Sequence, residues 1–173
     1  MMRNRIFPAA LACALLSLVV GGLFVGCNSL KDVDRVRFYA EVPDIGISRG
    51  LSTRLTMERS GLRYTVVREP VIFERNIIGV DLIRVESGRL ALQFMLDGEG
   101  TRALRRATLA HRGRHLIFTY NDMALGATRI DAPIMDGLVR TFVELPDERV
   151  EQLALQLQKN VEIVHDVVDR HDD

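Results

Sequence analysis

Two histidines have the residue type and spacing of a metal site, because two imidazoles four residues apart on a helix can bind one metal ion. His111 and His115 have this spacing, but Gly113 lies between them and favours the end of a helix. No cysteine is free to join them as a further ligand. We interpret the pair as a solvated helix end and predict no metal there.

The C-terminal segment also collects metal-ligating residue types, and His165 and Asp169 would share one face of a helix. The full set is His165, Asp166, Asp169, His171, Asp172 and Asp173. Terminal segments of this kind are usually frayed and solvated. We therefore expect residues 162–173 to form a charged tail, and we predict neither a metal nor a cofactor for the chain.

Acidic residues offer two further patterns. The Asp-Gly-Glu-Gly run of residues 97–100 lacks the aspartate spacing of an EF-hand and the Lys-Ser/Thr of a phosphate loop. Its glycines and acids suit a turn from a strand into a helix. Glu74 and Glu86 would form a carboxylate pair only if the fold brought them together. Ser48 lies in a Gly-Ile-Ser-Arg-Gly run over 46–50, but this run falls in an expected loop that leads into a strand, whereas a nucleophile elbow leads into a helix. The sequence therefore predicts no catalytic residue and a protein that is not an enzyme.

Cys27 is a further candidate, because its thiol follows directly on a long uncharged stretch of the sequence. Arg3 and Arg5 precede a long uncharged stretch, which ends in the apolar and small residues 23–26 just before Cys27. This layout resembles the signal peptide and lipobox of bacterial lipoproteins, although Phe24 stands where the family prefers leucine. The resemblance implies cleavage before Cys27 and attachment of lipid, including fatty acids such as palmitate, at that residue.

An uncleaved membrane anchor is the alternative, because about 20 apolar residues are enough to span a bilayer. Both alternatives place the rest of the chain outside the cytoplasm, since Arg3 and Arg5 stay inside. The lipoprotein resemblance implies a lipid anchor in the cell membrane or the outer membrane, with the domain facing the periplasm or the exterior. Asn28 follows the cysteine where aspartate would favour retention, so the same resemblance favours the outer membrane.

Composition limits the remaining function classes. The chain has 173 residues with 23 basic and 23 acidic side chains, and the two leader arginines leave a small acidic excess after cleavage. No basic excess indicates nucleic-acid binding. A composition that is 47% hydrophobic predicts one packed domain in the 147 residues after the leader. Cys27 would be the single cysteine left, so no intramolecular disulfide is expected.

Alternating apolar residues and short turn signals predict a domain built from hairpins. The turn signals are Ser60-Gly61, Ser87-Gly88 and Asn121-Asp122. The expected strands are 37–42, 53–59, 62–68, 80–86, 89–96, 114–120, 123–130 and 138–145. Helices are expected over 101–112 and from Pro146 to about 161, with 168 as the furthest end. The order predicts an α+β domain in which an antiparallel sheet carries two helices.

From residue 63 onward, the succession of these elements resembles the head subdomain of the first periplasmic domain of SecD. The matching features are the strand and proline-led turn of 64–70, the Glu-Arg-Asn-Ile motif of 74–77, the strand and turn of 90–100, Thr108 and Gly113, the strand of 115–120, Pro133-Ile134 and the helix of 147–157. Residues 127–129 depart from the family's Ser-Ala-Pro, and residues 142–145 stand where it tends to have a glycine. No membrane helix is expected after the leader, so proton-driven movement is not implied.

The expected organisation is a signal peptide over 1–26, a lipidated cysteine and tether over 27–36, a SecD head-like domain over 37–161 and the charged tail. The resemblance implies an affinity for polypeptides, with exported unfolded proteins or Sec translocase subunits as partners. Strand edges and a lip at Ile45 and Ile47 are the candidate contacts, since sheets can accept an added strand. The alternatives are a plain connecting loop over 44–52 and a structural envelope lipoprotein with no export role.

Overall fold

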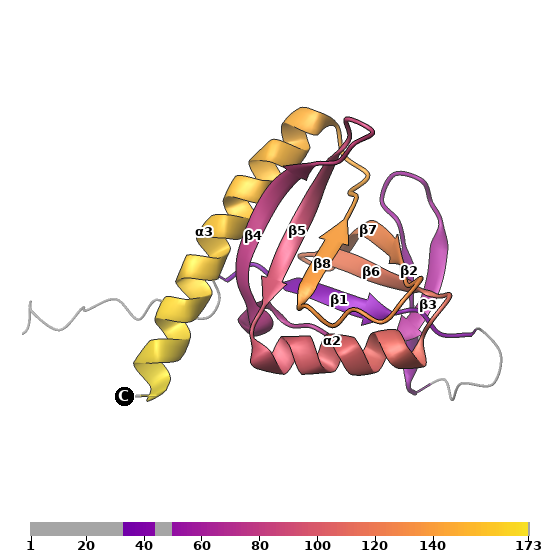
Figure 1. Ribbon diagram of the computed structural model, residues 1–173, viewed down its shortest axis with the longest axis horizontal. Helices are drawn as coiled ribbons and strands as arrows, with labels where there is room; N and C mark the ends of the chain where they lie inside the picture. Colours follow the sequence, from indigo (N-terminus) through magenta and orange to yellow (C-terminus); the bar gives the residue numbers. More distant parts are fainter. Residues whose placement is uncertain (1–32, 44–49, 173) are drawn as a thin grey trace, which may run out of the picture. The chain divides into compact units, whose positions relative to one another are not determined.

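Eight strands, two α-helices and one short 3-10 helix are formed by residues 33–43 and 50–172, which are those that the structure, a computed structural model, describes (Figure 1). The leader, Cys27 and the loop with Ile45 and Ile47 lie outside the described residues. The compact unit begins at Val33, four residues before the boundary expected from the sequence.

The first sheet, sheet A, has the antiparallel order β1-β6-β7, formed by Val36–Ala40, His115–Tyr120 and Met123–Arg129. The β6–β7 turn has φ angles of 49° at Asn121 and 68° at Asp122, which confirms the predicted tight hairpin. The register shifts inside this hairpin, because Thr119 pairs with Ala124 whereas Phe118 pairs with Gly126. Leu125 is the additional residue of this bulge, and it turns into the main core.

Sheet C has the antiparallel order β4-β5-β8, formed by Ile77–Arg84, Leu90–Leu96 and Leu138–Thr141. Gly88 turns the β4–β5 hairpin with a φ of 81°. The third sheet is the single hairpin of β2 and β3, formed by Ser52–Thr56 and Arg63–Val67, and Gly61 in its turn has a φ of 69°. All three hairpins therefore lie where the sequence predicts them.

The first long helix, α2 (Gly98–Ala110), begins where the acidic turn was predicted. The Asp97 carboxylate accepts a 2.6 Å hydrogen bond from the Gly100 amide and so caps the helix. Gly113 follows its end with a φ of 79°, the left-handed conformation that closes a helix. The short helix η3 (Glu74–Asn76) lies beside α2, and buried Asn76 accepts a hydrogen bond from the Asp97 amide through its carbonyl.

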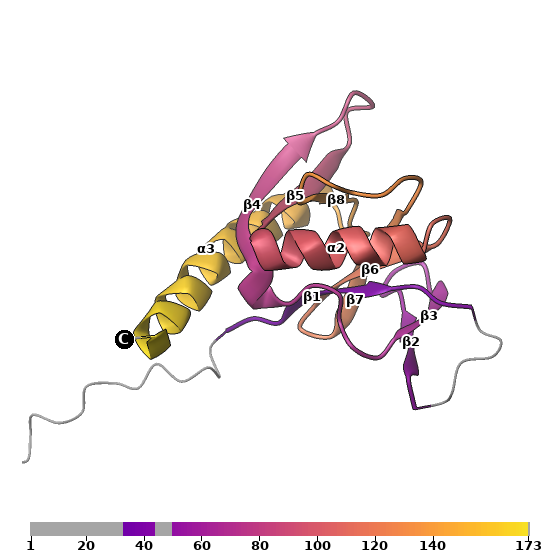
Figure 2. The ribbon, with the colours of Figure 1, turned by 60° about the horizontal axis from the view of Figure 1, so that its bottom comes forward.

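The C-terminal helix α3 runs from Asp147 to Asp172 along β4, as Figure 1 shows, and Figure 2 shows α2 crossing in front of the strands while α3 passes behind them. The expected charged tail is wrong at its start, because Val164 and Val167 are buried within α3. The apolar positions of α3 continue at helical spacing past 161, and this buries the segment. No described helix is apolar enough over a sufficient length to cross a membrane.

Two clusters of buried side chains hold the sheets together. Three rings meet in the main core, with centroids of Phe38, Phe94 and Phe118 separated by 5.0 to 5.3 Å. Sheets A and C and both helices contribute to this core. The second cluster lies between sheet A and the β2–β3 hairpin and consists of Met57, Val66, Ile117 and Ala124. Sheet A is thus buried on both faces.

Three strand edges, of the kind that the sequence suggested as contacts for a partner, carry hydrogen bonds to other parts of the described chain. The outer edge of β1 bonds to the chain at Val71 and Ile72, and that of β7 bonds to Glu58 and Glu144. Along β4, the Val80 carbonyl accepts a 2.9 Å hydrogen bond from the Gln158 amide group. These bonds occupy the positions that an added strand would use.

Candidate functional site

A groove of about 760 Å³ lies between the β2–β3 turn and the segment that follows β8. We call it the hairpin groove. It is lined by Arg59, Ser60, Tyr64, Arg89, Ala127, Phe142, Val143, Glu144 and Leu145. Its lining combines aromatic, aliphatic and charged side chains, the mixture that characterises binding surfaces rather than plain solvent-facing strands.

One side of the groove depends on a close approach of two backbones. Gly126 pairs with Val143, and the Glu144 amide donates a 2.8 Å hydrogen bond to the Leu125 carbonyl. A Cβ atom at Gly126 would lie 2.6 Å from the Phe142 carbonyl oxygen, so only glycine permits this approach. The approach fixes residues 142–145 against β7 and thereby sets where their side chains line the groove.

Phe142 and Arg89 form one wall. Phe142 is 36% exposed, and the guanidinium carbon of Arg89 lies 4.3 Å from the centroid of its ring. A cation over an aromatic face is attracted by the ring quadrupole, which orders both side chains. Arg89 directly precedes β5 and Phe142 directly follows β8, so the pairing of these two strands brings them together.

The turn of the β2–β3 hairpin forms another part of the lining. The Ser60 amide donates a 2.9 Å hydrogen bond to Oε2 of Glu144, and the Glu58 amide donates one of 3.1 Å to the Ala124 carbonyl. Met57 packs beneath the turn in the second core cluster. These contacts fasten the hairpin to sheet A on the groove side.

Tyr64 lines the groove from β3, and its ring centroid lies 5.3 Å from that of His115. Burial raises the pKa of the Tyr64 phenol, and the negative charges of Glu41 and Glu144 raise it further. The phenol therefore stays protonated at neutral pH and presents a hydrogen-bond donor without adding negative charge to the groove.

His115 is held by Glu41 rather than by the other histidine of the predicted pair. Oε2 of Glu41 lies 2.6 Å from the His115 Nδ1 and accepts a 3.0 Å hydrogen bond from the His115 amide. His111 ends α2, and burial, with a further contribution from Arg114, lowers the pKa of its imidazole. The two histidines thus have separate roles in the structure.

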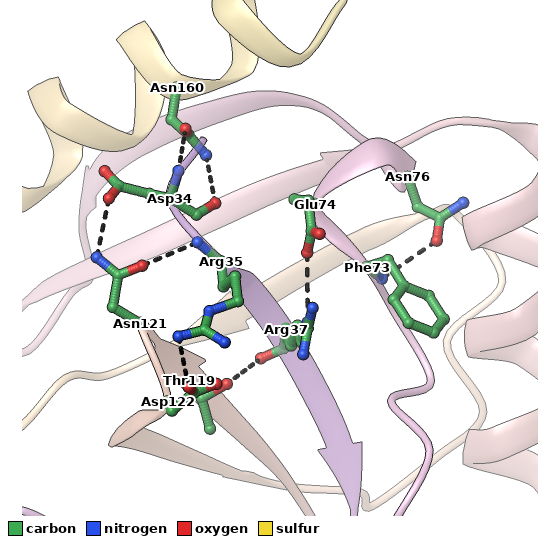
Figure 3. Close-up of polar contacts among 10 residues, drawn as sticks. All are labelled: Asp34, Arg35, Arg37, Phe73, Glu74, Asn76, Thr119, Asn121, Asp122 and Asn160. Atoms are coloured by element: carbon green, nitrogen blue, oxygen red, sulfur yellow. Dashed lines mark hydrogen bonds and ion pairs between the residues drawn. The ribbon is translucent and has the colours of Figure 1, made fainter. Parts of the chain in front are cut away.

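A second polar cluster, which we call the N-terminal clasp, ties residues 34 and 35 to the domain (Figure 3). The side-chain amide of Asn160 in α3 accepts from the Asp34 backbone N–H and donates to the Asp34 carbonyl, each at 2.9 Å. The Asp34 carboxylate accepts hydrogen bonds from Tyr120 at 2.6 Å and from Asn121 at 2.8 Å. Residues 34–36, which the sequence assigned to the expected tether, are therefore part of the domain.

The remaining sequence-predicted residues do not converge. Glu74 precedes β4 and Glu86 follows it, so an eight-residue strand of about 26 Å separates them and the fold does not bring the two carboxylates together. Glu74 instead pairs with Arg37 at 3.4 Å. His165 lies 3.1 Å from the Ile77 carbonyl through Nε2.

The described part of the chain contains no group of three or more metal-ligating side chains. Every buried side-chain nitrogen or oxygen there has a hydrogen-bond partner, so no buried polar atom awaits a ligand. Asp97 caps α2, Glu74 pairs with Arg37, and His115 and His165 contact Glu41 and Ile77.

Sequence reasoning missed the hairpin groove, because its walls come from segments far apart in the chain. One signal was present at Phe142, which begins the four-residue segment that departs from the SecD pattern. Arg59 and Arg89 each adjoin a glycine-containing hairpin turn, but nothing in the local sequence indicates that these two turns share a groove.

No family model and no curated protein matches this chain. Two solved structures share its fold. The first, described as the crystal structure of SecDF in a super-membrane-facing form, aligns with a TM-score of 0.54 and 14% identity. That alignment covers 72% of this chain and only 18% of the other, so the chain spans less than a fifth of that SecDF protein.

The second structure is described as that of SecDF, a membrane component that enhances protein export. It aligns with a TM-score of 0.54 and 11% identity, over 91% of this chain and 76% of the other. The chain therefore has the α+β fold of the SecDF periplasmic domains, which confirms the fold predicted from its sequence. At these identities the likeness establishes the fold alone.

Proposed function

We propose that this chain is a non-enzymatic lipoprotein of the bacterial envelope, attached to a membrane through Cys27, whose domain binds extended segments of exported polypeptides. The hairpin groove is the observation that carries the proposal. Its volume of about 760 Å³ suits a few residues of an extended chain, and its lining offers both apolar and polar contacts. The SecDF-like fold supports the export context by analogy.

Recognition in this proposal uses side chains in the groove rather than strand addition. The outer edges of β1 and β7 are bonded to other backbone segments, so adding a strand there would first require breaking those bonds. The exposed Phe142 ring and the Tyr64 hydroxyl need no such opening. An extended polypeptide can therefore bind with little rearrangement of the domain.

Photo-crosslinking in living cells tests the proposal. A photoreactive amino acid replaces Ala127 in the groove of the full-length chain, and in a matched variant it replaces Leu155, which is 67% exposed on α3 and lines no part of the groove. We expect adducts with many secreted polypeptides from position 127 and few from position 155. Equal adduct patterns from the two positions, or none from position 127, would contradict the proposal.

A structural envelope lipoprotein without an export role is the second candidate. The N-terminal clasp favours it, because the clasp fastens the root of the tether to both α3 and the β6–β7 turn, as a load-transmitting connection would require. Adducts with one envelope protein alone would support this role, and adducts with Sec translocase subunits would instead support an accessory role in export.

A further inference from the structure

The basic and acidic side chains that line the hairpin groove differ in whether they have partners. Arg59 and Arg89 are exposed, and neither forms an ion pair within the described part of the chain. Glu144 is the acidic residue of the lining, and one of its carboxylate oxygens already accepts the Ser60 amide hydrogen. The groove therefore presents two guanidinium groups whose natural complement is a carboxylate.

Arg89 is held in place for such a contact. Its cation–π contact with Phe142 restricts the side chain, and a guanidinium has five N–H donors, so it retains donors for a carboxylate. A side chain that is ordered before binding loses less conformational entropy when a ligand arrives. Phe142 meanwhile keeps part of its ring exposed beside that guanidinium.

The apolar part of the lining adjoins these charges. Ala127 and Val143 lie next to Phe142 in the groove, and Leu145 extends the apolar surface. An aromatic or large aliphatic side chain would bury area against them. The same short segment of a partner would thus meet apolar surface and positive charge together.

We propose that the hairpin groove selects extended polypeptide segments in which an aspartate or glutamate neighbours an aromatic or large aliphatic residue. The carboxylate is bound by Arg59 and Arg89, and the apolar side chain packs against Phe142 and Ala127. This inference rests on the proposed function, since it names the class of polypeptide that the groove takes.

Fluorescence anisotropy with the full-length protein in detergent micelles tests the selectivity. The probes are three labelled peptides with one extended sequence, in which a single position beside a phenylalanine carries glutamate, glutamine or lysine. We expect the glutamate peptide to bind about two- to fivefold more tightly than the glutamine peptide, the range for a partly exposed ion pair, and the lysine peptide to bind most weakly. Added salt should reduce this preference.

Arg89→Gln should remove most of the difference between the glutamate and glutamine peptides, whereas Arg106→Gln on the exposed face of α2 makes the same charge change and should preserve it. Circular dichroism and urea unfolding show whether both variants remain folded. If all three peptides bind equally and Phe142→Ala weakens the binding of each, the charge selectivity is overturned. The proposal that the groove binds polypeptides then still stands. Peptide binding that Phe142→Ala leaves unchanged, or no binding of any peptide, would overturn the groove itself.

Discussion

The Tyr120 hydroxyl donates a 2.6 Å hydrogen bond to Oδ2 of Asp34, which joins the end of β6 to the point where the chain enters the domain. The same carboxylate accepts from Asn121, and Asn160 of α3 holds the Asp34 backbone from the other side. Asp34 and Asn160 are 126 residues apart in the chain. Asp34 is therefore bonded to sheet A and to α3 at once.

Tyr120→Phe removes this hydrogen bond while keeping the ring. We expect a loss of about 1 to 2 kcal/mol in the free energy of unfolding, because a partly buried bond to a carboxylate is lost and, among the described residues, Asn121 is the side chain that still donates to Asp34. Urea unfolding measures the change. Arg35→Ala is the control in the same region, since its ion pair with Asp122 is exposed and should contribute less than about 1 kcal/mol. Equal losses in the two variants would contradict the importance of the Tyr120 bond.

High pH should weaken the same contact. Burial raises the pKa of Tyr120 above its ordinary value of 10, and hydrogen bonding to Asp34 and its charge raise the pKa further. The unfolded chain then releases the phenol proton at lower pH than the folded chain, so the stabilisation is complete below about pH 10 and declines as pH rises toward the folded-state pKa. We expect the stability difference between the native protein and Tyr120→Phe to shrink above about pH 10 in urea unfolding. A constant difference across that range would contradict the shift.

Gly126→Ala tests the backbone approach that shapes the hairpin groove. The new Cβ would lie 2.6 Å from the Phe142 carbonyl oxygen, so residues 142–145 must move away from β7. We expect a loss of about 1 to 3 kcal/mol in unfolding free energy, the cost of overpacking, together with weaker peptide binding. Gly50→Ala is the matched control, because nothing lies within 4 Å of the added atom. If a destabilised Gly126→Ala variant binds peptides as well as the native protein, the groove does not depend on the close approach of residues 142–145 to β7.

Features set by neighbouring residues could be predicted from the sequence, and those set by distant ones could not. Asn121 and Asp122 specify a primed turn by themselves, since both tolerate positive φ, and the hairpin was found where they predict it. The contact of Ser60 with Glu144 joins residues 84 apart. No turn signal or hydrophobic period contains that information, which is why the fold class was accessible and the groove was not.

The prediction for the C-terminal segment was wrong for a different reason, because it gave the composition of the segment more weight than the spacing of its apolar residues. Histidines and aspartates suggested a solvated tail, yet Val164 and Val167 continue the apolar spacing of the preceding helix. The spacing was the better guide, because burial of an apolar stripe against β4 outweighs the preference of the polar residues for water. The bonds on the outer edges of β1 and β7 could not be predicted from the sequence, since only the fold reveals which segments lie beside these strands.

Val164→Ala measures how much this last part of α3 contributes. The side chain is 4% exposed, and removing two methyl groups should cost about 1.5 to 2 kcal/mol in unfolding free energy. Val168→Ala makes the same chemical change at a position that is 42% exposed, and we expect a cost of less than about 0.5 kcal/mol there. Equal small effects in urea unfolding would restore the interpretation of residues 162–173 as a solvated tail.

Cys27→Ser tests membrane attachment, the part of the proposal that rests on sequence alone. Lipid transfer to a lipoprotein forms a thioether, and a serine hydroxyl cannot provide that sulfur. We expect Cys27→Ser to lose incorporation of an alkyne-labelled palmitate in growing cells and to keep its leader, which a shift to higher mass would show. Cys13→Ser is the matched control, because Cys13 lies within the predicted leader and should leave labelling unchanged. The contrary outcome is that the two variants match the native protein in palmitate labelling and in mass, while both stay with the membrane. The leader is then an uncleaved anchor, and a spanning segment holds the domain at the membrane in place of lipid.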